Sequence, residues 1–332
     1  MSSCCAASYV IAGRRPAEMH LAVYLPLLLP ALLTLLARPL SDRLHPLHAT
    51  WLLTGAAAVL AASATLALAL LAVSAVIRLP AVASLGHISL AELGPDTAYA
   101  MPAGLLAGIL VTAAAVTGSA SLLRCFRGLA DSYREARRLP GRSQAVVLDD
   151  QIAAAYALPG RPGRIVVTAG MLDALDDTSR AALLAHERAH LARFHHLFTS
   201  AARLAAAANP LLRPAARAVE YTVERWADEE AAKAVGDRRL VAHAIGRAAL
   251  AATPRRPPRR AMPAVLGAVF AGRADAHAAG PIPRRVEALL APVPPRRLAL
   301  LTVVLALALL AGVCALEAAN DFQDLLALAS SY

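Results

Sequence analysis

Charged and aromatic residues are scarce in this chain of 332 residues. It contains 58% hydrophobic residues but only 17% charged and 4% aromatic residues. Such an apolar composition is not typical of a soluble protein with one or two domains, so we expect part of the chain to lie in a lipid bilayer. Little interleaving of aromatic and basic side chains is present, which argues against a nucleic-acid partner.

Cysteine is also rare, with four residues in the whole chain. Cys4 and Cys5 are adjacent, whereas Cys125 and Cys314 lie far apart, and no C-x-x-C pattern occurs. This usage supports neither a disulfide framework nor a zinc site made of cysteines. A metal site in this protein would need histidine and carboxylate ligands.

Basic residues outnumber acidic ones, 33 to 23, which gives a formal net charge of +10. Nearly all of the positive charge comes from arginines that flank apolar runs, and such arginines usually remain on the cytoplasmic side of a membrane. The runs themselves contain almost no ionisable residues. A transporter or channel would need such residues inside its spans, so this class is disfavoured.

Four apolar runs are long enough to cross a bilayer. They cover residues 20–37, 49–77, 101–123 and 298–316. We therefore predict a mainly α membrane protein with about four transmembrane helices, three of them within residues 19–123. Residues 1–18 show no clear periodicity, and we expect them to be spurious or disordered.

The arginines also predict the topology of the chain. A cluster of arginines follows the third run between residues 124 and 142, and Arg296 and Arg297 precede the fourth run. We therefore expect residues 124–295 to lie in the cytoplasm, and residues 296–332 to form the last span and a short external tail.

The expected cytoplasmic region has a core at residues 143–250, followed by a linker rich in proline and arginine at residues 253–260. Two short β-branched runs, 145–150 and 164–170, predict a small sheet. An α+β domain is therefore expected here. The apolar stretch 196–212 is interrupted by Arg203 and reads better as a buried or interfacial helix than as a fifth span.

The pattern H-E-x-x-H occurs at His186, Glu187 and His190. Residues four apart in an α-helix lie on one face, so both imidazoles can bind one metal ion. Glu187 follows the first histidine directly and can take a proton from a water that the metal activates. The pattern is short, but leucines surround it and Asp176 to Thr178 provide the acids and cap of a helix N-terminus. We interpret it as the centre of a zinc hydrolase.

A zinc site of this kind needs a third protein ligand. Glu224 and Asp228 lie four residues apart in a second helical run, a spacing that suits a ligand and its helper. We expect Glu224 to complete the ligand set and Asp228 to accept a hydrogen bond from a ligand histidine. Other carboxylates compete, and spacing alone does not exclude Glu220; the others are Glu229 and Glu230.

The two patterns carry a family resemblance. H-E-R-A-H at 186–190 followed by E-R-W-A-D at 224–228 resembles the paired motifs of membrane-bound zinc metallopeptidases of the gluzincin type. These are the HtpX and CAAX prenyl protease family and the related beta-lactam-sensor-type peptidases. Residues 153–175 also resemble the strand segment before the motif helix in such enzymes, and Asn209-Pro210 resembles an Asn-Pro between their two helices.

The resemblance implies a zincin-like fold with one Zn²⁺ per subunit, bound by His186, His190 and Glu224. Glu187 is then the general base, and Asp228 supports a ligand histidine. In such enzymes an edge strand pairs with the substrate backbone, for which the residues Arg164 to Thr168 are our candidate; a plain structural hairpin is the alternative. A histidine ahead of an arginine-bearing helix can stabilise the oxyanion, and His277 takes this role in our prediction, although its spacing departs from the family pattern.

The remaining histidines are interpreted as ordinary residues. His45 and His48 have no acid or cysteine ligand close in sequence, so we expect loop histidines. His195 lies five residues beyond His190, off the ligand face of the helix, and it and His196 are not expected to contact zinc.

Four spans with the soluble region between the third and fourth agree best with the beta-lactam-sensor-type peptidases. The sequence after the last span is too short for their external ligand-binding domain, so we expect any signal to come from a regulatory partner protein. We predict an endopeptidase of the cell membrane that cleaves membrane or cytoplasmic proteins. The alternative is a membrane signal transducer with a structural zinc site, for which Glu187 has no necessary role.

Overall fold

The computed structural model describes residues 16–85, 100–252, 281–292 and 298–329. Within these ranges the chain is mostly helical, with one small sheet. The elements of the membrane part are α2 (Pro16–Arg43), α3 (Pro46–Ile77), α4 (Pro80–Leu85), α5 (Ala100–Arg138) and α13 (Leu298–Ala329). The elements between them are β1 (Ala145–Leu148), β2 (Ala155–Leu158), β3 (Arg164–Thr168), α6 (Ala169–Asp173), α7 (Asp177–Ala192), α8 (His195–Ala208), a short 3-10 turn η1 (Pro210–Leu212), α9 (Arg213–Val235), α10 (Arg238–Ala252) and α12 (Pro281–Leu290).

Four of these helices are long and apolar enough to cross a membrane, as the sequence predicted. Their candidate spans are Val23–Arg43, Pro46–Ile77, Met101–Arg138 and Ala299–Asp324. The structure extends two of them: α5 continues without a break through the arginine cluster, and α13 includes most of the expected tail. A helix satisfies its backbone hydrogen bonds internally, so it can continue beyond the apolar run without leaving polar groups unpaired. The helix α2 begins at Pro16, slightly before Met19.

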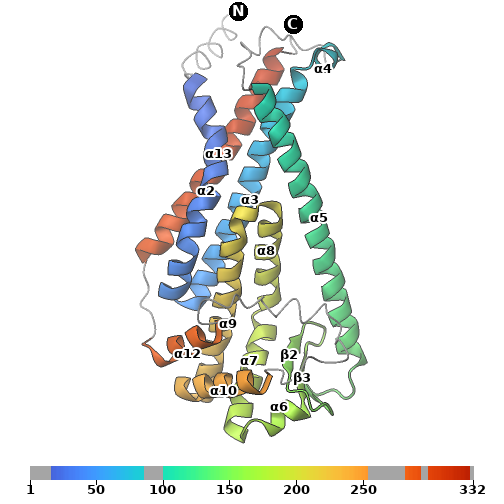
Figure 1. Cartoon of the computed structure of the whole chain (residues 1–332), viewed down its shortest axis with the longest axis vertical. Helices are drawn as coiled ribbons and strands as arrows, with labels where there is room; N and C mark the ends of the chain where they lie inside the picture. Colours follow the sequence, from blue (N-terminus) through green and yellow to red (C-terminus); the bar gives the residue numbers. More distant parts are fainter. Residues whose placement is uncertain (1–15, 86–99, 253–280, 293–297, 330–332) are drawn as a thin grey trace, which may run out of the picture.

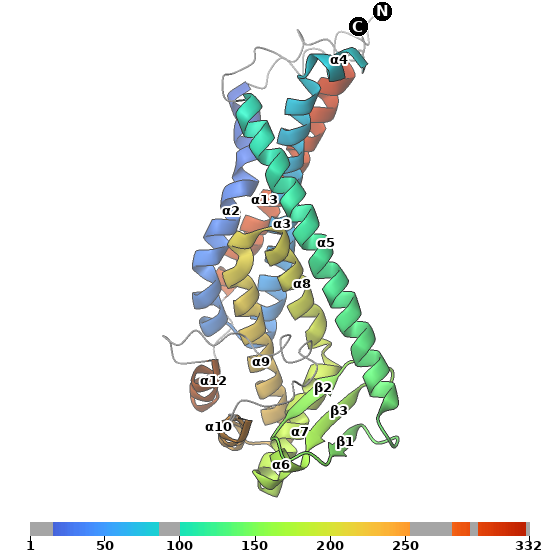
Figure 2. The same cartoon turned by 45° about the vertical axis from the view of Figure 1, so that its right-hand side comes forward.

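The molecule has two levels along its long axis (Figure 1). The long helices α2, α3 and α13 occupy one end, and the sheet with α6, α7, α10 and α12 occupies the other, whereas α5 runs from the first end to the sheet. An antiparallel hairpin of α8 and α9 joins the two levels, with its tip beside the lower half of the long helices (Figure 2). Residues 196–212 were expected to form a buried or interfacial helix. They form most of α8 and the tip of the hairpin, which are not among the candidate spans.

The hairpin shares one hydrophobic core with the long helices. Buried side chains in this core include Leu33, Leu53, Leu212, Val219 and Val304, from α2, α3, η1, α9 and α13. Hydrogen bonds add to the packing.

Polar contacts tie the hairpin to three different long helices. The Thr117 hydroxyl donates to the Ala207 carbonyl at 2.6 Å, and the Thr34 hydroxyl donates to the Leu211 carbonyl. The Thr50 hydroxyl donates to that of Thr222 at 3.0 Å. These bonds fix the height of α9 relative to the spans.

The sheet has three strands in the order β1-β3-β2. Strand β3 pairs parallel with β1 and antiparallel with β2, and all five of its residues are buried. The prediction that Arg164 to Thr168 forms an edge strand is therefore wrong. An uninterrupted β-branched run is typical of a strand buried on both faces, and β2 takes the edge position next to α7.

Three predictions lie wholly or largely outside the described residues. The proline-rich linker at 253–260 and the candidate oxyanion residue His277 both belong to the range 253–280, which the structure does not describe. Residues 1–15, which make up most of the segment expected to be spurious, lie outside as well.

A close backbone approach fixes α6 against the segment after β1. The Gly170 amide donates to the Asp150 carbonyl at 2.9 Å, and a Cβ atom on Gly170 would overlap the backbone oxygen of Gln151. Neither the Gly170 backbone nor the Gln151 carbonyl can move without disturbing the sheet. Glycine is therefore required at position 170 by space alone.

We expect Gly170→Ala to lower the free energy of unfolding by about 1–3 kcal/mol, because the added methyl group overpacks this contact. Gly246→Ala is the control: Gly246 lies within α10 with no atom near its missing Cβ, so alanine should be neutral or stabilise by about 0.5–1 kcal/mol. Thermal unfolding of both variants in detergent measures the difference. Equal melting temperatures would contradict the packing described here.

Candidate metal centre

The helix α7 presents the two motif histidines. Its N-terminus is capped by Asp176, whose carboxylate accepts a hydrogen bond from the Ser179 amide at 2.8 Å. The cap predicted from the sequence is thus present. His186 and Glu187 are buried, with 8% of each exposed. His186 and His190 lie one turn apart, and their Nε2 atoms are 3.0 Å apart.

The helix α9 brings the third candidate ligand to this pair. Glu224 Oε2 lies 3.6 Å from His186 Nε2, and Glu224 Oε1 lies 3.5 Å from His190 Nε2. One donor atom from each of these three residues lies within 4.8 Å of the others, a group that could hold a metal ion. The helices α7 and α9 therefore bring together the three residues that the sequence singled out.

The distances fit a zinc ion. Zinc binds histidine nitrogen at about 2.0–2.1 Å and carboxylate oxygen at about 2.0–2.2 Å, so ligand atoms at the corners of a tetrahedron lie about 3.3–3.5 Å apart. The observed separations of 3.0, 3.5 and 3.6 Å surround this value. With three protein donors a fourth position stays open for water or substrate, the arrangement of catalytic zinc sites.

The competing carboxylates are engaged elsewhere. Glu220, which spacing alone could not exclude, accepts a hydrogen bond from Arg203 Nε at 2.7 Å. Glu229 pairs with Arg238 at 2.6 Å, and the Glu230 carboxylate pairs with an arginine and a lysine. Glu229 and Glu230 lie on other faces of α9 than Glu224. Glu220 shares the face of Glu224, but it lies one turn before it and is bound to Arg203.

Asp228 lies against His186, one turn after Glu224. Its Oδ1 atom is 2.9 Å from His186 Nδ1, and the side chain is 1% exposed. The contact orients the ring so that Nε2 faces His190 and Glu224. This is the position expected for a carboxylate that supports a ligand histidine.

Arg285 of α12 contacts the carboxylates of Asp228 and Glu224. The sequence analysis missed this arginine. Its Nε and Nη2 atoms donate to the two Asp228 oxygens at 2.8 and 2.6 Å, and its Nη1 atom lies 2.9 Å from Glu224 Oε2. An arginine fork suits such a two-pronged contact and holds the carboxylates in place. The family resemblance pointed to an arginine-bearing helix in this part of the chain. It implied a role in oxyanion stabilisation for His277, which lies outside the described residues, and no role for Arg285.

His195 is the second residue that the sequence analysis missed. Its Nδ1 atom lies 3.1 Å from His190 Nδ1, and its ring is 1% exposed and packs against Trp226. On a continuous helix it would lie off the ligand face. Phe194 has φ 50°, a left-handed conformation that ends α7 and turns His195 back under His190. No sequence pattern predicts this left-handed turn at Phe194.

Three further histidines of the described residues lie outside the group. His45 precedes α3 and His48 lies in its first turn, so the expectation of a loop is wrong for His48. Their rings are tilted by 60° with centroids 5.4 Å apart, and neither residue belongs to the candidate metal group found among the described residues. His196 lies at the start of α8 with its ring against Phe194. That none of the three is a ligand stays a prediction.

Glu187 has an unusually basic carboxylate. Burial raises its pKa to about 7, and the nearby Glu224 charge also raises it, whereas His186, Arg285 and a hydrogen bond from the Ala157 backbone lower it. A carboxylate whose pKa lies near neutrality is well suited to take and return a proton. The hydrogen bond also places Glu187 beside the edge strand β2.

The two motif histidines share one proton in the metal-free protein. Burial opposes the charged form of both rings, but the Asp228 and Glu224 carboxylates raise the pKa of His186 to about 10. For His190, burial and the positive His186 ring lower the pKa to about 4. At neutral pH, His186 is therefore protonated and His190 is neutral.

A metal ion must displace the proton of His186, so its affinity should depend on pH. Because the pKa of His186 is raised to about 10, the ring is protonated below this value and metal affinity rises with pH. We expect the zinc affinity to rise about tenfold per unit between about pH 6 and 8, with release of about one proton per ion. Calorimetry in buffers of different ionisation enthalpy measures this release. An affinity independent of pH would contradict the assignment of the proton.

One family matches part of the chain. Residues 120–204 match Peptidase family M48, a stretch that runs from α5 to α8 and contains His186, Glu187 and His190 but ends before Glu224. No curated protein and no solved structure matches the chain. Together with the four apolar helices and the His-His-Glu group, this similarity over part of the chain suggests a membrane-associated metallopeptidase.

Proposed function

We propose that the protein is an integral-membrane zinc endopeptidase. The observation that carries this proposal is the convergence of His186, His190 and Glu224, with the Glu187 carboxylate buried beside them. Nothing in the packing of α7 requires a buried acid at position 187. A site built only to bind a structural metal would not need it.

Zinc, when bound by His186, His190 and Glu224, would act as a Lewis acid that polarises a scissile carbonyl and lowers the pKa of water. Glu187 removes the proton from the attacking water and later passes it to the leaving amine. Asp228 and Arg285 keep the ligand side chains in place, and His195 fixes the ring of His190.

The substrate backbone binds along β2 in this proposal. Strand β2 pairs with β3 along one edge. The backbone of Ala157 in β2 also makes a hydrogen bond to Glu187. An extended peptide added at this edge passes directly over the metal group. Recognition through backbone hydrogen bonds tolerates many side chains, as a protease with several substrates requires.

The proposed topology places the catalytic region in the cytoplasm, at the inner face of the cell membrane. The support is the arginine cluster after the third span and the arginines before the fourth. This layout favours the beta-lactam-sensor type within the wider group, with membrane or cytoplasmic proteins as substrates. A partner protein then supplies the signal for regulatory proteolysis.

Glu187→Gln tests the proposal, because it removes the base and leaves all three metal ligands. We expect the variant to keep one zinc ion per chain and to lose turnover by about 10²–10⁴-fold. His186→Ala should lose both zinc and turnover. Cleavage of β-casein and of membrane proteins in proteoliposomes, measured beside zinc content on the full chain, gives both readouts.

Glu220→Gln is the matched control, since it removes an acid of the same helix that lies outside the metal group. It should keep zinc. Zinc-loaded wild-type protein without cleavage of any substrate would refute the protease and favour a signal transducer with a structural zinc site. Full turnover in Glu187→Gln would refute the assigned base.

A further inference from the structure

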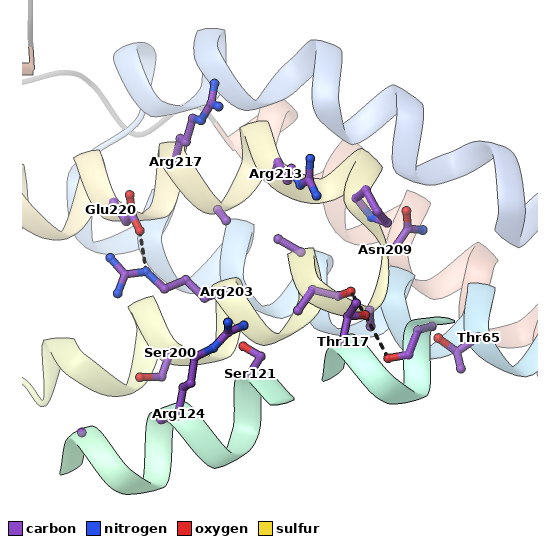
Figure 3. Close-up of a pocket in the computed structure, with 18 of the residues that line it drawn as sticks. Thr65, Thr117, Ser121, Arg124, Ser200, Arg203, Asn209, Arg213, Arg217 and Glu220 are labelled. Atoms are coloured by element: carbon purple, nitrogen blue, oxygen red, sulfur yellow. Dashed lines mark hydrogen bonds and ion pairs between the residues drawn. The ribbon is translucent and has the colours of Figure 1, made fainter. Parts of the chain in front are cut away.

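A large cavity lies between α5 and the α8–α9 hairpin, away from the metal group (Figure 3). Its volume is about 1490 Å³. Pockets for drug-sized molecules usually measure about 300–1,000 Å³, so this space accommodates a larger ligand. Residues of α3, α5, α8 and α9 contribute to its lining, and α5 diverges from α3 towards the sheet (Figures 1 and 2).

The polar part of the lining carries excess positive charge. Five arginines contribute to it, against the two carboxylates Asp131 and Glu220. Glu220 is already bound to Arg203 at 2.7 Å, as Figure 3 shows. Within the described ranges no carboxylate lies within ion-pair distance of the lining arginines Arg124 and Arg213. The cavity is thus complementary to an anion.

These arginines lie close to the level of the spans. The hairpin tip is bonded to Thr117, and Thr117 precedes Arg124 by about 10 Å along the axis of α5. Arg213 begins α9 directly after this tip. A cationic side chain near the hydrocarbon region is costly unless an anion or water compensates it.

The other part of the lining is aliphatic and comes from the spans. It includes Leu27 of α2, Leu68 of α3, and Leu110 and Ala113 of α5. In a membrane the neighbours of such side chains are acyl chains. One cavity therefore combines an anion-binding part with a part that suits hydrocarbon.

We propose that this cavity binds a phospholipid with an anionic headgroup. The headgroup lies among Arg124, Arg203 and Arg213, and an acyl chain lies along the aliphatic lining of α2, α3 and α5. The ligand fills the gap between α5 and the hairpin and compensates the arginines. This site goes beyond the proposed proteolysis and depends only on insertion of the spans in a membrane.

The test uses the full chain, purified in detergent and freed of lipid. Native mass spectrometry measures binding of dioleoyl phosphatidylglycerol and of dioleoyl phosphatidylcholine, which share acyl chains but differ in net charge. We expect one phosphatidylglycerol to bind at least about tenfold more tightly, because arginine contacts to phosphate are charge-assisted. The double variant Arg124→Gln, Arg213→Gln should lose at least about tenfold of this affinity.

Arg137→Gln, Arg138→Gln is the matched control. Both residues are exposed at the end of α5, outside the cavity, and the change removes the same charge. It should alter the affinity by less than about twofold. Ala113→Trp, which fills the aliphatic part, should weaken phosphatidylglycerol binding if an acyl chain lies there.

Three results would overturn the proposal. The first is equal binding of the two lipids, or an equal loss in the control variant. The second is displacement by inorganic phosphate with no effect of Ala113→Trp, which would identify a site for a free anion. The third is binding of an acidic peptide, in place of lipid, that depends on Arg124 and Arg213. Because lipid binding is measured without proteolysis, failure here leaves the protease proposal untouched.

Discussion

The crossing of α7 and α9 is held together by opposite charges buried in one small volume. His186 carries the proton, Glu224 and Asp228 carry the negative charges, and Arg285 adds a second cation from α12. Burying any one of these charges alone would be costly, so each depends on its neighbours. A divalent cation can replace the proton without disturbing the carboxylates. His186, His190 and Glu224 lie in a geometry close to the one that zinc needs.

This centre is also fixed relative to the membrane part. The helix that carries Glu224 and Asp228 has its other half in the hydrophobic core of the spans, and Thr222 is bonded to Thr50 of α3. A change in the packing of the long helices would thus move one half of the metal group against the other half on α7.

The sequence was sufficient for the local parts of this architecture and insufficient for the long-range ones. Periodicity and capping predicted α7, and helical spacing placed Glu224 with Asp228 on one face. Contacts made by tertiary packing were not predictable: Arg285 reaches the site from a helix far along the chain, and the left-handed Phe194 returns His195 to His190. The edge strand was misassigned because its place was taken from the family resemblance, whereas an uninterrupted β-branched run is typical of a strand buried on both faces.

The account rests on two imidazoles and one carboxylate around a single ion. X-ray absorption at the zinc edge, on full-length protein loaded with one equivalent of Zn²⁺, tests this most directly. We predict a shell of nitrogen and oxygen with the outer-shell scattering of two imidazoles, which drops to one imidazole in His190→Ala and loses the carboxylate contribution in Glu224→Ala. A shell without imidazole scattering, or a spectrum unchanged by both substitutions, would contradict the account.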